Sequence, residues 1–439
     1  MNQYLIFLPG IMGSELFRGA DLIWPGPAKS LWFPYKLMDQ LLDPALQVGD
    51  IIRSFSVSEQ YGALMAKLGQ AGFSEQNRRL AVCPYDWRKR NEDAAETLAQ
   101  MIEKTAAERG PDVEITLIAH SMGGLISRYY LESGLFHQRA GFARVKNLFT
   151  LGTPHRGSPL ALTAAAGLEK RLFLSRQQVQ QLVQLPDFPS LYQLLPPPGD
   201  DFAWDDRDGK DLYRPFPVYD RGAADLALTA ENLQSARDFR ARLTGIAPAG
   251  VRYFCFTGTR MPTLTHVRIT AGIDALQVIR MEAEDAGDGT VPSWSGGLPG
   301  VQGQFVGGEH GTIYKSRELL TTLGGLLGVK NTLAADIPPV QIAIRDKVME
   351  PGVPAHLSIS FPTSINGLTG EVAVERVFEA PDGKIARTAV IQTYPVKYEG
   401  MGAEKLNLMF KAPQDPGFFH ILFRAPGIDA QDDFFIQDE

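Results

Sequence analysis

Hydrophobic positions in the first 330 residues form short apolar runs that alternate with longer amphipathic stretches. Short apolar runs are typical of buried strands, whereas apolar positions spaced three and four apart are typical of helices. Strands that alternate with helices predict a doubly wound, mostly parallel α/β sheet with helices on both faces. The expected strands are 4–8, 79–83, 113–119, 145–151 and 251–257, and the clearest expected helix is 92–109.

The strand pattern stops between residues 158 and 247. Three helical patterns, 161–174, 176–185 and 226–243, surround a loop rich in proline and aspartate at 196–217. We interpret residues 158–247 as a helical cap inserted over the edge of the sheet. The α/β core is then expected to comprise residues 1–157 and 248–330.

The pattern changes again after residue 330. Residues 331–339 contain the breakers and small residues of a linker. Beyond them, polar and apolar residues alternate in short runs separated by turn signals. Such runs indicate strands, and seven short strands in about 100 residues are typical of an immunoglobulin-like sandwich. We expect this C-terminal all-β sandwich to span 340–439, with strands at 340–344, 356–361, 371–378, 385–394, 406–410, 418–423 and 433–436.

Charge and cysteine content narrow the functional classes. The net charge of −7 argues against a nucleic-acid partner, because no basic stripe is present to neutralise phosphates. Cys83 and Cys255 both lie in apolar runs, which predicts buried free thiols. Neither a signal-peptide pattern nor an apolar run of about 18 residues is found, so we expect a cytoplasmic protein, with export by a route lacking a signal peptide left open.

Ser121 is the candidate nucleophile. The apolar run 113–119 ends at His-Ser-Met-Gly-Gly, and a helical pattern follows at once. A serine on such a strand-to-helix turn is a typical hydrolase nucleophile, and the strained turn requires small residues two positions before and after it. Ala119 and Gly123 meet this requirement, although Ala119 stands where glycine is usual. A purely structural tight turn is the alternative.

A serine nucleophile needs a histidine base and an acid that orients the base, in the chain order serine, acid, histidine for this type of sheet. Of the seven histidines, His120 is expected to point away from Ser121, two follow without an intervening acidic loop, and two belong to the predicted sandwich. His266 and His310 remain. Asp288 lies between glycines in a tight loop and His310 follows in a glycine-rich segment, so we predict this pair, with a turn aspartate and a surface histidine as alternatives.

The expected oxyanion hole consists of two backbone amides. In this architecture one donor follows the nucleophile and the other lies in an earlier strand-to-loop turn. Met122 supplies the first. The turn at residues 8–13 points to Ile11 for the second.

Six motifs give the sequence a resemblance to the lecithin:cholesterol acyltransferase-like family of α/β hydrolases, which includes phospholipid:diacylglycerol acyltransferases and lysosomal-type phospholipase A2. They are residues 8–14 (LPGIMGS), 84–88 (PYDWR), 119–124 (AHSMGG), 152–158 (GTPHRGS), 188–196 (FPSLYQLLP) and 287–292 (GDGTVP), and the resemblance extends over about the first 320 residues.

The resemblance implies that Ser121, Asp288 and His310 match the family's catalytic triad, and that Ile11 and Met122 match its oxyanion donors. It also implies action on acyl esters of lipids, with transfer of the acyl group to water or to an alcohol.

The segment 20–35 departs from the family. Mammalian members pin a tryptophan-bearing lid with a disulfide, whereas this segment has no cysteine. Trp24 and Trp32 are candidate substrate-binding residues of a mobile flap that contacts a lipid or membrane surface transiently. A packed loop is the equal alternative.

These patterns together predict a serine-dependent lipid acyl-ester hydrolase or O-acyltransferase that works through an acyl-enzyme and needs no metal or organic cofactor. An esterase or lactonase for small soluble esters is the nearest alternative. A catalytically idle hydrolase scaffold, whose C-terminal sandwich binds a protein or glycan, is the alternative from another class.

Overall fold

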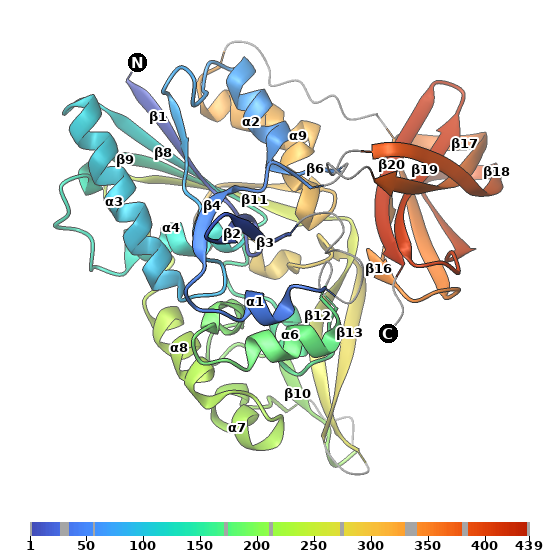
Figure 1. The fold of residues 1–439 in the computed structure, drawn as a ribbon, viewed down its shortest axis with the longest axis horizontal. Helices are drawn as coiled ribbons and strands as arrows, with labels where there is room; N and C mark the ends of the chain where they lie inside the picture. Colours follow the sequence, from blue (N-terminus) through green and yellow to red (C-terminus); the bar gives the residue numbers. More distant parts are fainter. Residues whose placement is uncertain are drawn as a thin grey trace.

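The computed structural model describes residues 2–26, 35–55, 58–170, 174–209, 214–272, 276–329, 340–379 and 385–436. A layered α/β body forms most of the molecule, and an all-β unit built from the C-terminal residues lies at its side (Figure 1). The predicted linker 331–339 lies outside the described residues, as does Trp32.

The body is organised around a six-stranded sheet in which every pair of neighbouring strands is parallel. This confirms the predicted parallel α/β sheet, and all five predicted strands belong to it. The sixth, β14, was not predicted, because its five residues begin and end with glycine. The strand order is β14 (Gly303–Gly307), β11 (Arg252–Thr259), β9 (Val145–Leu151), β8 (Glu114–His120), β1 (Gln3–Leu8) and β7 (Leu80–Val82).

Helices cover both faces of this sheet because its strands are apolar on both sides. In β1, Ile6 and Leu8 join one hydrophobic cluster, while Leu5 and Phe7 join the other. Helices α3 (Asn91–Arg109) and α4 (Met122–Glu132) pack on the first side, and α2 (Tyr61–Gln70) and α9 (Arg317–Leu326) pack on the second (Figure 1).

The inserted segment is largely helical, but it differs from the prediction in two respects. It contains α5 (Leu160–Ala165), α6 (Arg176–Val183), the 3-10 helix η3 (Pro189–Leu194), α7 (Val218–Asp225) and α8 (Ala230–Ala241). The expected helix 161–174 is too long, since α5 ends at Ala165 and Gly167 then adopts a positive φ of 75°. The expectation that strands are absent here is also wrong, because β10 (Ala203–Asp205) pairs with β12 (Met261–Ala271).

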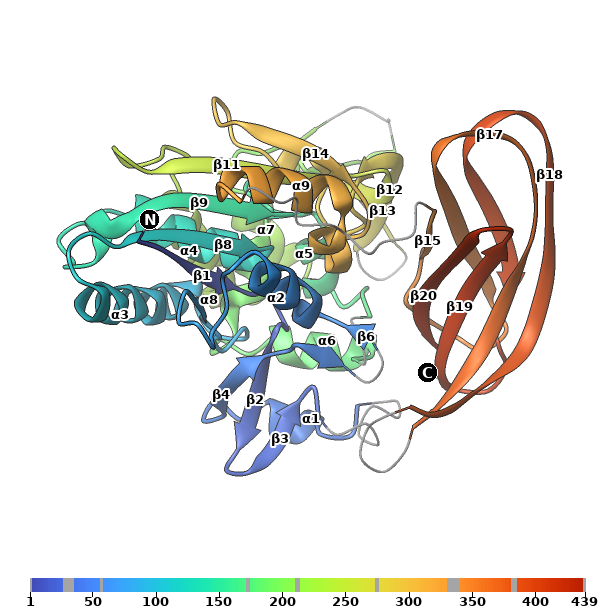
Figure 2. The ribbon, with the colours of Figure 1, turned by 90° about the horizontal axis from the view of Figure 1, so that it is seen from above.

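A long antiparallel hairpin follows β11 and was not predicted. Strand β12 pairs with β13 (Leu276–Gly287), and together with β10 they form a separate three-stranded sheet. Strand β13 leads directly into Asp288. The hairpin lies on the side of the body that faces the all-β unit (Figure 2).

A smaller sheet follows β1. It has the order β3 (Asp21–Trp24), β2 (Ser14–Arg18) and β4 (Gln47–Ile51), and the short helix α1 (Met38–Leu41) lies next to it in the chain. The paired strands β5 (Ser54–Phe55) and β6 (Ser58–Glu59) complete this region.

The C-terminal unit is all-β, as predicted, but several expected short strands are joined. Residues 356–361 and 371–378 both belong to β17 (Pro354–Glu379), and the runs 385–394 and 406–410 both belong to β18 (Ile385–Lys411). Register shifts between residues 360 and 367 interrupt the pairing without ending either strand. The remaining strands are β15 (Gln341–Ile344), β16 (Val348–Met349), β19 (Gly417–Ala425) and β20 (Ile428–Ile436).

Two composition-based expectations can be compared with this fold. Cys83 and Cys255 are buried and free, as predicted, and burial raises the pKa of the Cys83 thiol to about 12. Among the described helices, none is both long enough and apolar enough to cross a membrane.

Candidate active site

Ser121 lies on the sharp turn between β8 and α4. Its backbone has φ 52° and ψ −123°, a conformation that side-chain-bearing residues rarely adopt and that costs about 1–3 kcal/mol. The turn passes so close to β1 that a Cβ atom at Gly123 would lie 2.5 Å from the carbonyl oxygen of Pro9. Glycine is therefore required at 123, whereas Ala119 is accommodated as a fully buried residue.

The structure brings Ser121, His310 and Asp288 together. Ser121 Oγ lies 2.8 Å from His310 Nε2, and His310 Nδ1 lies 2.8 Å from Asp288 Oδ2. Asp288 is 1% exposed and Ser121 is 5% exposed, so this hydrogen-bonded chain is shielded from bulk water. The three side chains are thus placed for proton transfer from a serine hydroxyl to an imidazole.

The Asp288 carboxylate is held by its own turn. Its Oδ1 accepts hydrogen bonds from the amides of Thr290 at 3.1 Å and Val291 at 2.7 Å, which leaves Oδ2 for His310. The amide of His310 also donates to the Asp288 carbonyl at 2.9 Å. Acid and base are therefore linked through both backbone and side chains.

His120 was expected to point away from Ser121 and was not considered as the base, and its ring nitrogens indeed bond other groups around the site. Its Nε2 lies 2.9 Å from the His310 carbonyl oxygen, so Nε2 must carry the proton. Its Nδ1 then accepts from the Tyr61 hydroxyl at 2.8 Å, and that hydroxyl accepts from the Gly10 amide at 2.9 Å. Burial lowers the pKa of His120 to about 3, which keeps the ring neutral. The sequence signal for this role was only its position next to Ser121.

The turn expected to hold the oxyanion passes beside the nucleophile. A Cβ atom at Gly10 would lie 2.9 Å from Ser121 Cβ and 3.4 Å from Ser121 Oγ, so only glycine permits this approach. Tyr85 supports the turn, because its hydroxyl donates to the Pro9 carbonyl at 2.8 Å. Ile11 follows Gly10 directly, and Met122 begins helix α4 directly after Ser121.

Two further motifs hold the acid loop and the inserted segment together. Ser158 Oγ donates to the Thr290 carbonyl at 2.6 Å, which ties the 152–158 motif to the Asp288 turn. A Cβ atom at Gly157 would lie 2.4 Å from the backbone nitrogen of Pro196, so glycine allows the close contact with the 188–196 motif. The motifs that carry the family resemblance therefore meet around the site.

Trp24 does not lie where a lipid-contacting flap would require it. It is 0% exposed, its ring packs 5.2 Å from Trp87 and 5.7 Å from Tyr35, and its Nε1 donates to the Met12 carbonyl at 2.9 Å. The expectation that Trp24 reaches substrate or a membrane surface is wrong, because the indole packs inside the body. The same expectation for Trp32 concerns a residue outside the described ranges.

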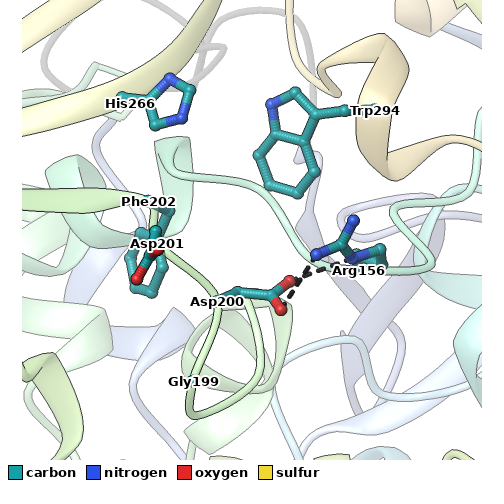
Figure 3. A pocket seen from close by; sticks show the side chains of 7 residues that line it. All are labelled: Arg156, Gly199, Asp200, Asp201, Phe202, His266 and Trp294. Atoms are coloured by element: carbon teal, nitrogen blue, oxygen red, sulfur yellow. Dashed lines mark hydrogen bonds and ion pairs between the residues drawn. The ribbon is translucent and has the colours of Figure 1, made fainter. Parts of the chain in front are cut away.

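His266, the other candidate base, lies elsewhere. It lines a cavity of about 310 Å³ with Trp294, Arg156 and Asp200 (Figure 3), and Ser121 is not among the lining residues. Its ring centroid is 5.2 Å from that of Trp204. Burial lowers the pKa of His266. The geometry therefore joins His310 to Ser121 and places His266 in a separate cavity.

Comparison with known proteins supports part of the motif-based resemblance. A family model described as lecithin:cholesterol acyltransferase matches residues 51–241. Phospholipase A(1) LCAT3 of Arabidopsis thaliana is 32% identical over 109 residues, which cover 23% of this chain and 23% of that protein. Lecithin-cholesterol acyltransferase-like 4 of Arabidopsis thaliana is 30% identical over 177 residues, covering 38% of this chain and 30% of that protein. The matches thus span less than a third of either relative.

Solved structures that match this chain include the lipase BlEst2 of Bacillus licheniformis. Its mature form is 17% identical, covers 75% of this chain and 91% of its own, and has a TM-score of 0.37. Its propeptide form is 13% identical, covers 98% and 92%, and has a TM-score of 0.38.

The family match includes Ser121 but ends before Asp288 and His310, and it is shorter than the 320 residues over which the motifs were expected to extend. The placement of Asp288 and His310 beside Ser121 therefore comes from the geometry alone and not from the match. Over residues 51–241 the match confirms the resemblance indicated by the motifs, and this part of the chain is lecithin:cholesterol acyltransferase-like.

Proposed function

We propose that this protein is a serine-dependent lipid acyl-ester hydrolase or acyltransferase. The observation that carries the proposal is the hydrogen-bonded chain from Ser121 Oγ through His310 to Asp288, with 2.8 Å at each step. The strained backbone of Ser121 supports it, because such strain persists mainly where function requires it.

In the first half-reaction, Ser121 Oγ attacks the acyl carbonyl carbon while His310 Nε2 takes the hydroxyl proton. Asp288 stabilises the imidazolium and keeps its orientation. The amides of Ile11 and Met122 hold the negative oxygen of the tetrahedral intermediate. When this intermediate collapses, the bond to the leaving alcohol breaks, His310 returns the proton to that alcohol, and the acyl group remains on Ser121.

In the second half-reaction, an acceptor hydroxyl attacks the acyl-enzyme, with His310 again acting first as base and then as acid. Water as acceptor gives the free acid, and an alcohol gives a new ester. The lipid class of the substrate is supported by the lecithin:cholesterol acyltransferase match rather than by the triad, which acts on any acyl ester.

The test is a comparison of phospholipid vesicles with short nitrophenyl esters as substrates for the wild-type protein and Ser121→Ala. We expect hydrolysis of both substrates by the wild type, a higher rate on vesicles, and no activity above background in the variant. Activity on short esters alone would support the small-ester alternative, and equal activity in Ser121→Ala would refute the proposal. Adding a long-chain alcohol and measuring the new ester distinguishes transfer from hydrolysis.

A further inference from the structure

The body and the all-β unit meet through ion pairs. Lys170 Nζ lies 3.3 Å from Glu350 Oε1, and Lys405 Nζ lies 3.4 Å from Asp285 Oδ1. Both views show the all-β unit on the side of the body where β13 lies (Figure 1 and Figure 2). At these positions, oppositely charged side chains therefore hold the body and the all-β unit together.

One short loop of the all-β unit, between β15 and β16, supplies two more of these ion pairs. Arg345 contacts the carboxylate of Glu282, and Lys347 Nζ lies 3.0 Å from Glu309 Oε2. The side chain of Glu309 is 18% exposed and that of Lys347 is 36% exposed, so this pair is shielded more than an ordinary surface pair. The Lys347 ammonium also contacts Asp432 of its own unit, which holds it in place.

The two acids bound by this loop lie in the segments that lead to the proposed acid and base. Glu282 is on β13, the strand that leads into Asp288. Glu309 directly precedes His310. The all-β unit therefore contacts both segments that deliver the acid and the base to Ser121.

The segment before and after His310 is rich in glycine, so a side-chain contact adds restraint to the hydrogen bonds that already hold His310. Residues 307–311 read Gly-Gly-Glu-His-Gly, and Gly308 has a φ of 132°. A Cβ atom at Gly308 or Gly311 would have no neighbour within 4 Å, so packing at these positions does not restrict the backbone. Glycine loses more conformational freedom on folding than any other residue. Apart from His310, Glu309 has the one side chain in this segment that reaches another part of the protein.

We propose that Lys347 is a positioning residue of the active site: its ion pair with Glu309 fixes the backbone from which His310 reaches Ser121. The all-β unit thereby contributes to the reaction without contacting the reacting atoms. This inference rests on the proposed function, because it assigns Lys347 a role through His310. Small displacements of a catalytic group reduce its rate strongly even when the cause is remote.

The test compares Lys347→Met, Glu309→Gln, the double variant and Lys347→Arg on a short soluble ester. We expect kcat to fall roughly ten- to a hundredfold in each of the two single variants, with KM nearly unchanged. The double variant should be no slower than the slower single variant, because both changes remove the same contact. Lys347→Arg keeps the charge and should restore most of the rate.

Glu350→Gln is the matched control, since it removes the ion pair with Lys170 at the same interface without involving the His310 segment. We expect it to keep the wild-type kcat. The inference is overturned if Lys347→Met and Glu350→Gln have the same kcat, or if all variants lose kcat only in proportion to a loss of melting temperature. Activity that survives Ser121→Ala would instead overturn the proposed function, so the two failures are distinguishable.

Discussion

Ser121 and His120 are neighbours in the chain, yet only the first was predicted to belong to the site. The strained turn at Ser121 could be predicted because such a turn leaves a pattern of small residues around the serine. His120 acts through Tyr61 and the carbonyl of His310, which are 59 and 190 positions away, so no local pattern reveals its contacts. The burial of Trp24 was unpredictable for the same reason, because it depends on Trp87 and Tyr35.

The amide of Ile11 provides a prediction about the oxyanion hole. Ile11→Pro removes this donor without deleting a side-chain hydrogen bond, and one such donor contributes about 3 kcal/mol to the transition state. We expect kcat to fall about a hundredfold or more in a protein that remains folded by circular dichroism. A folded Ile11→Pro variant with the wild-type kcat would show that this amide has no such role.

His120 provides a prediction about stability and pH. Its pKa is lowered from 6.5 to about 3 by burial, so between these values the unfolded chain binds a proton that the native protein does not. Stability attributable to His120 is therefore full above pH 6.5 and declines as the pH falls, by up to about 1.4 kcal/mol per pH unit. His155 acts in the same direction, whereas Glu309, whose pKa burial raises to about 7, acts in the opposite one.

The measurement is urea unfolding of the wild type and His120→Gln at pH 7 and pH 5. Because His155 and Glu309 are present in both proteins, their contributions cancel in the comparison. The variant should lose less stability on acidification than the wild type. Equal losses would mean that His120 is not held neutral in the native protein.

At the scale of elements, the parallel strands and the main helices could be predicted because the apolar pattern within each one shows which of its side chains are buried. Strand β14 is too short and glycine-rich to give such a pattern. In the β12–β13 hairpin, only the last residue of β13 is buried, so its sequence lacks the apolar alternation of a strand with one buried face. Strand β17 was divided in the prediction because turn-like residues at 362–367 interrupt the alternation without ending the strand, and Pro395, Gly400 and Gly402 do the same in β18.

Helix α4 carries a buried ion pair whose loss should destabilise the folded protein. Arg128 and Glu132 have side chains that are 2% and 0% exposed, with Nε to Oε1 at 2.8 Å. Replacing Glu132 with glutamine leaves a buried guanidinium without its counter-charge, which costs about 3–5 kcal/mol. Glu399→Gln is the control, because its pair with Lys397 is 73% and 67% exposed and such pairs contribute about 1 kcal/mol or less.

Guanidinium unfolding of both variants checks this prediction. A large loss for Glu132→Gln and almost none for Glu399→Gln is expected. Losses of equal size would contradict the assignment of the buried pair as a support of helix α4.

At the scale of the whole molecule, the family match covers Ser121 and most of the inserted segment, while Asp288, His310 and the all-β unit lie beyond it. That Ser121, Asp288 and His310 lie together could be predicted, because each stands in a suitable loop and the three follow one another in the order serine, acid, histidine. The ion pairs between the two parts could not, because the sequence does not indicate which charged residues face one another after folding. The contact of Lys347 with Glu309 links these parts to the site.

Labelling with a fluorophosphonate tests the central claim most directly, because this reagent forms a covalent bond with a serine only when its hydroxyl is activated. We expect one label per chain, located at Ser121 by mass spectrometry of peptides and absent from Ser121→Ala. His310→Ala and Asp288→Asn should label more slowly by orders of magnitude while keeping the wild-type circular dichroism, and His266→Ala should label at the wild-type rate. An unlabelled Ser121, or equal labelling rates in the wild type and His310→Ala, would contradict the assignment of this site as a serine hydrolase triad.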